Sequence, residues 1–200
     1  MDLMAAGLGL GVFNYILATA ELVWEWKWNT GQIRRLRRQE LILFAGSLLL
    51  VFYGNFMYGG ITYQTVKFWL LSSLLMTAAW IDWKERIVPD QLLVIYGILL
   101  VIHRLLFFDA MLLADSLLGA AAGSGILLAA YMCKKDSVGL GDVKLMVLCG
   151  WAAGLMGVLS LLFRAVLFAA VVSGILLLRK KAQLKTELPF VPFLFLGSLF

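Results

Sequence analysis

The stretch that decides the fold is residues 143–178, VKLMVLCGWAAGLMGVLSLLFRAVLFAAVVSGILLL, where Lys144 and Arg164 are the only charged residues. A helix of this length, at 1.5 Å per residue, would extend about 54 Å, whereas the hydrocarbon core of a bilayer is roughly 30 Å thick. The segment therefore predicts two membrane crossings, 143–158 and 159–178. The cluster of Gly150, Gly154 and Gly157 is the natural place for the chain to turn back.

The composition of the whole chain agrees with a membrane protein. Hydrophobic residues make up 62% of the 200 positions and charged residues only 14%. One soluble core of this size cannot cover so much apolar surface, so lipid must contact much of the exterior. Breaks in the apolar pattern predict a single all-α, polytopic domain over residues 1–200. Its eight segments are 3–24, 41–59, 64–81, 90–108, 111–133, 143–158, 159–178 and a short or re-entrant 188–200.

The basic residues predict the orientation of these segments. Fourteen of the 17 Lys and Arg residues fall on one side, in 25–40, 82–89, 134–142 with Lys144, and 179–187. The positive-inside rule places that side in the cytoplasm and both termini outside a cell membrane. The net charge of +5 then reflects membrane orientation and not nucleic-acid binding. Trp24, Trp26 and Trp28 predict an aromatic belt at the inner interface, followed by an Arg-rich segment that contacts lipid.

Charges within spans need partners, because an isolated charge in lipid is costly. Asp115 and Arg164 are at comparable depth, which predicts an ion pair between them. His103, beside Arg104, is expected to be an interfacial polar residue. The two cysteines, Cys133 and Cys149, form neither a CxxC pair nor a zinc-ligand spacing, so no metal or other cofactor is expected.

Two acidic residues, Asp82 and Asp142, lie at the predicted cytoplasmic ends of apolar runs. Each has a structural interpretation when considered singly: Asp142 as a helix N-cap, and Asp82 as a solvated loop residue. If their helices are neighbours, however, the two carboxyls converge at one depth. Such a pair shares a proton, so that one member can activate water while the other protonates a carbonyl oxygen. Gly139 and Gly141, just before Asp142, leave room for an extended peptide backbone.

Three segments, taken in their order along residues 81–200, resemble those of the type IV prepilin peptidases, which are membrane aspartyl proteases with a GxGD motif. Gly139-Leu-Gly-Asp142 with Val143-Lys144-Leu145 matches that motif, and Ile81-Asp82 with Pro89-Asp90 is similar to the family's first aspartate segment. The closing 188–194 stretch, LPFVPFL, is similar to the family's Pro-Phe-x-Pro-x-Leu pattern.

The resemblance implies that Asp82 and Asp142 are the catalytic pair. We expect Gly139, Gly141, Lys144 and Pro89 to bind substrate or support the loops, and Lys144 has two further interpretations: it stabilises the ionised aspartate near it, or it lies at the membrane interface. It also implies prepilin or pseudopilin substrates, cut on the cytoplasmic side after a short basic leader. Bifunctional members carry a cytoplasmic domain with paired CxxC motifs after the first span and methylate the new N-terminus. The corresponding loop here, 25–40, is short and has no cysteine, which predicts peptidase activity alone.

Two other functions use the same residues. A proton- or ion-coupled transporter would use the two aspartates as a relay, although the sequence shows no inverted repeat and places neither at mid-membrane. A non-enzymatic subunit of pilus or secretion assembly could retain the fold without its chemistry.

Overall fold

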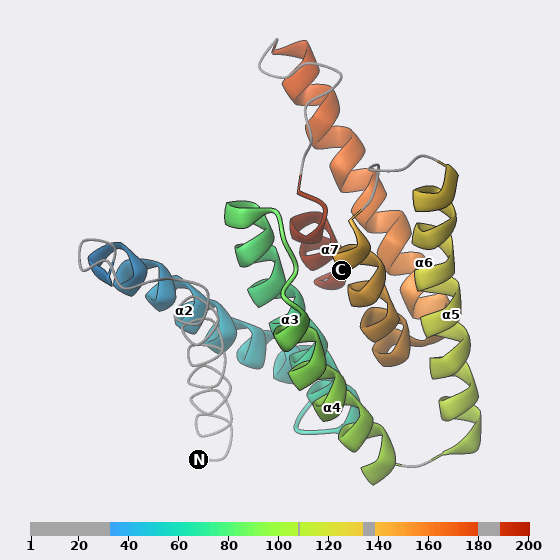
Figure 1. Cartoon of the computed structure of the whole chain (residues 1–200). Helices are drawn as coiled ribbons and strands as arrows, with labels where there is room; N and C mark the ends of the chain where they lie inside the picture. Colours follow the sequence, from blue (N-terminus) through green and yellow to red (C-terminus); the bar gives the residue numbers. More distant parts are fainter. Residues whose placement is uncertain (1–32, 108, 134–138, 180–188) are drawn as a thin grey trace. The chain divides into compact units, whose positions relative to one another are not determined.

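A computed structural model describes residues 33–107, 109–133, 139–179 and 189–200 of the chain (Figure 1). The elements within these ranges are α2 (Ile33–Tyr58), α3 (Tyr63–Glu85), α4 (Asp90–Leu106), α5 (Ala110–Cys133), α6 (Leu140–Leu178) and α7 (Val191–Ser198). These ranges contain helices and no strand, which confirms the all-α prediction for the described part of the chain. The predicted span 3–24 and the tryptophans at 24, 26 and 28 lie outside the described residues.

The chain divides into two compact units, Met1–Thr77 and Ala78–Phe200. In the first unit, α2 approaches α3 at Gly54, where an added Cβ would come within 2.7 Å of the rings of Phe68 and Trp69. Trp69 is buried there together with Val51. The second unit contains both aspartates and the three segments that the sequence singled out.

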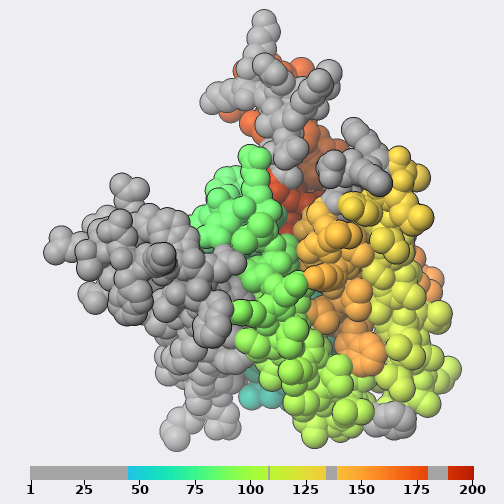
Figure 2. All heavy atoms as spheres, in the orientation of Figure 1, coloured from blue at the N-terminus to red at the C-terminus, as the bar shows by residue number. Residues whose placement is uncertain are grey.

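Helices α5 and α6 form the main packing of the second unit. At their crossing, Gly119 faces Gly150 so closely that a Cβ on Gly150 would lie 2.2 Å from the Gly119 carbonyl oxygen. Small residues of this kind allow helix backbones to approach each other, which is a common way to pack helices in membranes. Figure 2 shows the atoms of α5 and α6, in yellow to orange, side by side on one face.

The backbone of α6 is interrupted at Gly154, as the sequence predicted. Gly154 has φ 77° and ψ −178°, a combination that L-residues rarely adopt, and Figure 1 shows the two halves of α6 running in different directions on either side of this point. Asp115 of α5 lies directly against the turn, and its Oδ1 accepts a 3.0 Å hydrogen bond from the N–H of Leu155. Asp115 thus satisfies a backbone donor at the start of the second half of α6.

This arrangement corrects the predicted Asp115–Arg164 ion pair. Arg164 instead donates to Ser160, one turn earlier in its own helix, through Nε to the carbonyl oxygen (3.1 Å) and Nη2 to the hydroxyl (3.1 Å). The partner of Asp115 is a backbone amide, which the turn at Gly154 leaves without a bond inside the helix. A prediction based only on side-chain charge could not include this partner.

Helices α5 and α6 are the two described helices that are long and apolar enough to cross a membrane. The predicted segments 41–59, 64–81, 90–108 and 188–200 correspond to helices α2, α3, α4 and α7. Helix α2 begins at Ile33, however, so part of the predicted loop 25–40 is helical. The number of crossings and the orientation of the chain remain predictions.

Candidate active site

Asp82 lies in the last turn of α3, where its side chain is only 6% exposed. The helix ends at Glu85. The next residue, Arg86, has a φ of 57° in the left-handed region, and its N–H donates to the Asp82 carbonyl oxygen. The Oδ2 atom of Asp82 accepts a 3.1 Å hydrogen bond from the N–H of Val191, the first residue of α7. The closing segment of the chain therefore orients the first aspartate of the motif.

Asp142 lies in the first turn of α6, three residues after Gly139, which is the N-cap. Asp142 is therefore not the N-cap itself, unlike its structural interpretation from the sequence. Gly141 contacts the segment that follows α3, because a Cβ on Gly141 would lie 3.0 Å from Cβ of Val88. Gly141 thus allows the start of α6 to lie against the chain that connects Asp82 to α4.

The charge of Asp82 is close enough to affect the ionisation of Asp142. Both lie outside the predicted spans 64–81 and 143–158. Burial raises the pKa of Asp142 to about 6, together with repulsion from Asp82, while a hydrogen bond from the Gly139 backbone opposes this shift. Burial also raises the pKa of Asp82, against the opposing effects of the Val191 hydrogen bond and the Arg86 charge. Two carboxyls with these properties can hold one proton between them at mildly acidic pH.

A third contact joins the two segments at their outer edge. Nζ of Lys144 lies 2.7 Å from Oδ1 and 2.8 Å from Oδ2 of Asp90. Asp90 is the first residue of α4, and Pro89 is its N-cap with φ −67° and ψ 132°. Lys144, which the sequence placed near substrate or loops, therefore connects the starts of α4 and α6.

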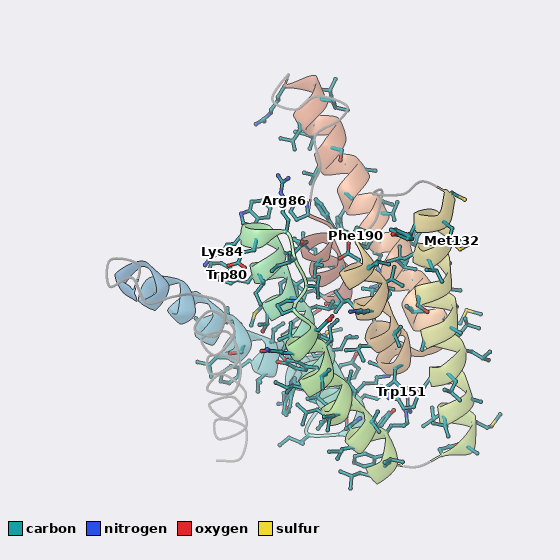
Figure 3. The ribbon with its side chains drawn as sticks, in the orientation of Figure 1. Trp80, Lys84, Arg86, Met132, Trp151 and Phe190 are labelled. Carbon is teal, nitrogen blue, oxygen red and sulfur yellow. The ribbon has the colours of Figure 1, made fainter. Side chains whose placement is uncertain are left out.

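The labelled side chains in Figure 3 indicate which end of the second unit holds the site. Lys84, Arg86 and Phe190 lie toward one end, and Trp151 lies toward the other. Trp80 and Lys84 contact each other, with Nζ 4.6 Å from the centre of the ring. The basic residues that follow Asp82 thus lie at the same end as the start of α7.

Two polar contributors to the site were not predicted from the sequence. The first is the N–H of Val191, because a backbone donor leaves no signal in the sequence. The second is Asp90, which appeared only as part of a motif. Asp90 and Lys144 lie 54 positions apart, so their pairing leaves no local signal in the sequence.

At the opposite end of α4, His103 and Arg104 lie within the packing of the helices, and the interfacial depth of His103 stays a prediction. Both side chains are buried, at 7% and 5% exposure. Arg104 donates to the hydroxyl of Ser116 in α5 and, at 3.4 Å, to the carbonyl oxygen of Trp151 in α6. This cluster holds three helices together away from the aspartates, so its role is structural.

The sequence of this chain is similar to those of known proteins. Residues 69–174 match the family model for the type IV leader peptidase family. The prepilin leader peptidase/N-methyltransferase of Xanthomonas campestris pv. campestris is 31% identical over 132 residues, which cover 62% of this chain and 45% of the relative. The chain thus spans less than half of that relative's length. No solved structure matches it. Because the family match covers more than half of the chain, and includes both Asp82 and Asp142, the protein belongs to the type IV leader peptidase family.

Proposed function

We propose that this protein is an intramembrane aspartyl endopeptidase that removes the basic leader of prepilin-like or pseudopilin-like substrates at the cytoplasmic face of the cell membrane. The observation that carries the proposal is the position of Asp82 at the end of α3 and Asp142 at the start of α6, where the charge of Asp82 acts on Asp142 and the segment after α3 lies against Gly141 through Val88. Paired carboxyls of this kind hydrolyse peptides without a nucleophilic side chain.

In the proposed reaction Asp82 is the base and Asp142 the acid. Asp82 has two neighbours that favour its ionised form, the Val191 N–H and the Arg86 charge, whereas the charge of Asp82 favours the protonated form of Asp142. Asp82 takes a proton from water as the water oxygen attacks the scissile carbonyl carbon, and Asp142 protonates the carbonyl oxygen. When the tetrahedral intermediate collapses, the C–N bond breaks. The leaving amine takes the proton from Asp82, and Asp142 regains a proton from the intermediate.

The proposed substrate follows from the family and from the membrane-edge position of the aspartates. A leader cut just before a hydrophobic helix brings its scissile bond to the membrane surface, where both carboxyls are expected. Because loop 25–40 has no CxxC motif, we propose that the protein does not methylate the new N-terminus.

The test is co-expression of a pilin-like substrate, with a basic leader, a glycine and a hydrophobic helix, with wild type, Asp82→Asn or Asp142→Asn. Mass spectrometry of the substrate should show leader loss without an added methyl group in wild type, and no loss in either variant. Asp109→Asn is the matched control. Oδ1 of Asp109 accepts from the N–H of Met111 at the start of α5, and asparagine preserves such a cap. Cleavage that persists in either active-site variant would show that Asp82 and Asp142 are not the catalytic pair. Proton-driven flux without cleavage would favour a transporter.

The cytoplasmic orientation can be tested with the native cysteines. Cys133, at the end of α5, is exposed and precedes a predicted cytoplasmic loop, whereas Cys149 is buried in α6. A membrane-impermeant maleimide should label wild type in inverted vesicles but not in intact spheroplasts, and Cys133→Ser should remove the label. Labelling in intact spheroplasts would reverse the proposed orientation.

A further inference from the structure

We propose that Asp90 and Lys144 are positioning residues, whose ion pair holds the segments carrying Asp82 and Asp142 in the geometry that cleavage requires. This inference rests on the proposed peptidase function and adds two residues to its machinery. Asp90 follows Asp82 by eight positions, and Lys144 follows Asp142 by two. Each partner is thus attached to one aspartate by a short piece of chain.

The connection between Asp82 and Asp90 has little freedom. The helix α3 continues past Asp82 to Glu85, Arg86 ends it in a left-handed conformation, and Pro89 begins α4 with a fixed φ. Between these points Val88 lies against Gly141. A shift of Asp90 relative to α6 must therefore displace Val88 or alter the end of α3, and either change moves Asp82 relative to Asp142.

The ion pair is suited to position and not to stability. Both side chains are largely exposed, 56% for Lys144 and 67% for Asp90, and exposed ion pairs contribute about 0–1 kcal/mol to folding. The two oxygens of Asp90 lie almost equally far from Nζ of Lys144, which fixes the direction of the contact. A misplacement of about 1 Å in a reacting group can cost about a hundredfold in rate. A pair with little effect on melting can therefore have a large effect on turnover.

A second role for Lys144 would be direct electrostatic stabilisation of ionised Asp142. The two roles differ in their pH signature. If charge acts directly, Lys144→Gln removes a cation and Asp90→Asn removes an anion, so the two variants shift the pH profile in opposite directions. If the pair acts through position, both variants lower kcat, and the pH profiles of cleavage by the two variants coincide.

The experiment measures cleavage of a purified pilin-like substrate by wild type, Asp90→Asn, Lys144→Gln and the double variant. We expect each single variant to lose about tenfold in kcat with little change in KM, and the double variant to lose no more than either single one. Asp90→Glu with Lys144→Arg, which keeps the opposite charges, should recover part of the rate. Lys84→Gln is the matched control, because it removes a basic residue from the same end of the unit but not from the pair. Additive losses, or opposite pH shifts, would overturn the positioning role.

Hydrogen exchange of the purified protein in detergent gives a readout that does not require activity. Asp90→Asn and Lys144→Gln should each accelerate amide exchange in residues 86–93 and 140–146, and Lys84→Gln should not. Unchanged exchange in both segments would overturn the inference even for an active enzyme. Faster exchange together with a wild type that cleaves no pilin-like substrate would uphold the ion pair's role and refute the proposed function.

Discussion

The N–H of Val191 donates a 3.1 Å hydrogen bond to Oδ2 of Asp82, across 109 positions of the sequence. The donor is the first residue of α7, and α7 packs against the second half of α6 through Gly197. The orientation of Asp82 thus depends on the last helix of the chain. A closing helix that contains no titratable side chain is in this way part of the candidate active site.

Displacement of α7 should therefore reduce cleavage. A Cβ at Gly197 would lie 3.3 Å from the Ala165 nitrogen and the Leu161 carbonyl oxygen, so Gly197→Leu must push α7 away from α6. We expect roughly a tenfold loss in kcat, since a small misplacement of Asp82 slows the reaction, and a smaller loss for Gly197→Ala. Ser198→Ala is the control, because in the described part of the chain its hydroxyl donates within α7, to the Phe195 carbonyl oxygen. Equal rates for Gly197→Leu and wild type would show that α7 does not orient Asp82.

Substitution of Gly154 should destabilise the protein severely. A Cβ there would lie 1.9 Å from Oδ2 of Asp115, and the positive φ is strained for any L-residue. Gly154→Ala is expected to lower the free energy of unfolding by about 3 kcal/mol or more, because backbone strain and the displacement of Asp115 act together. Gly125→Ala in α5 is the control, because its Cβ would meet nothing within 4 Å and alanine favours helix by about 0.5–1 kcal/mol. Thermal unfolding in detergent measures both, and a Gly154→Ala variant as stable as wild type would contradict the structure.

The pH dependence follows from the raised pKa of Asp142, about 6. The folded protein holds this proton more tightly than the unfolded chain, so the related stability is present at low pH and is lost as pH rises from about 4 to about 6. Asp142→Asn carries no such charge, and we expect it to melt about 2–4 °C above wild type at pH 7.5, equivalent to roughly 1 kcal/mol. This advantage should shrink at pH 4.5. An advantage that is constant with pH would mean that Asp142 does not titrate in this range.

Cleavage should also depend on the same proton. Because the proposed acid is protonated Asp142, kcat should fall as pH rises above about 6. The apparent pKa values read from the pH profile of kcat belong to the coupled pair, so they report the shared titration of Asp82 and Asp142. A rate that rises steadily through pH 8 would exclude Asp142 as the acid.

Loss of Arg104 should destabilise the packing of α4, α5 and α6 without touching the aspartates. Arg104→Met removes the donors to Ser116 and to the Trp151 carbonyl oxygen and leaves buried acceptors unpaired. We expect a loss of about 2–4 kcal/mol in thermal unfolding. Arg164→Gln is the matched control. Among the described residues its guanidinium bonds to Ser160 of its own helix, so the expected change is below about 1 kcal/mol. Similar losses in the two variants would show that the buried contacts of Arg104 do not contribute to stability.

The helices were predictable where apolar length and backbone chemistry decide the outcome. Pro89 and Asp90 mark the start of α4, and Gly154 marks the turn in α6, because proline and glycine constrain the backbone wherever they occur. The pairing of Asp115 and the burial of Arg104 were not predictable from charge and position. Both depend on which atoms the helix packing brings together, and in both the partner includes a backbone group. Asp82 and Asp142 were found from their positions at the ends of apolar runs, but their orientation by Val191 and their connection through Asp90 required the structure.

The contact between Asp115 and the amide of Leu155 also has a consequence for biogenesis. The cap precedes its turn in the chain, so Asp115 is synthesised before the amide that it satisfies, and α5 is complete when Gly154 leaves the ribosome. The second half of α6 is therefore synthesised after the acceptor that its first amide needs, and the order of translation matches the order in which the turn needs its partner.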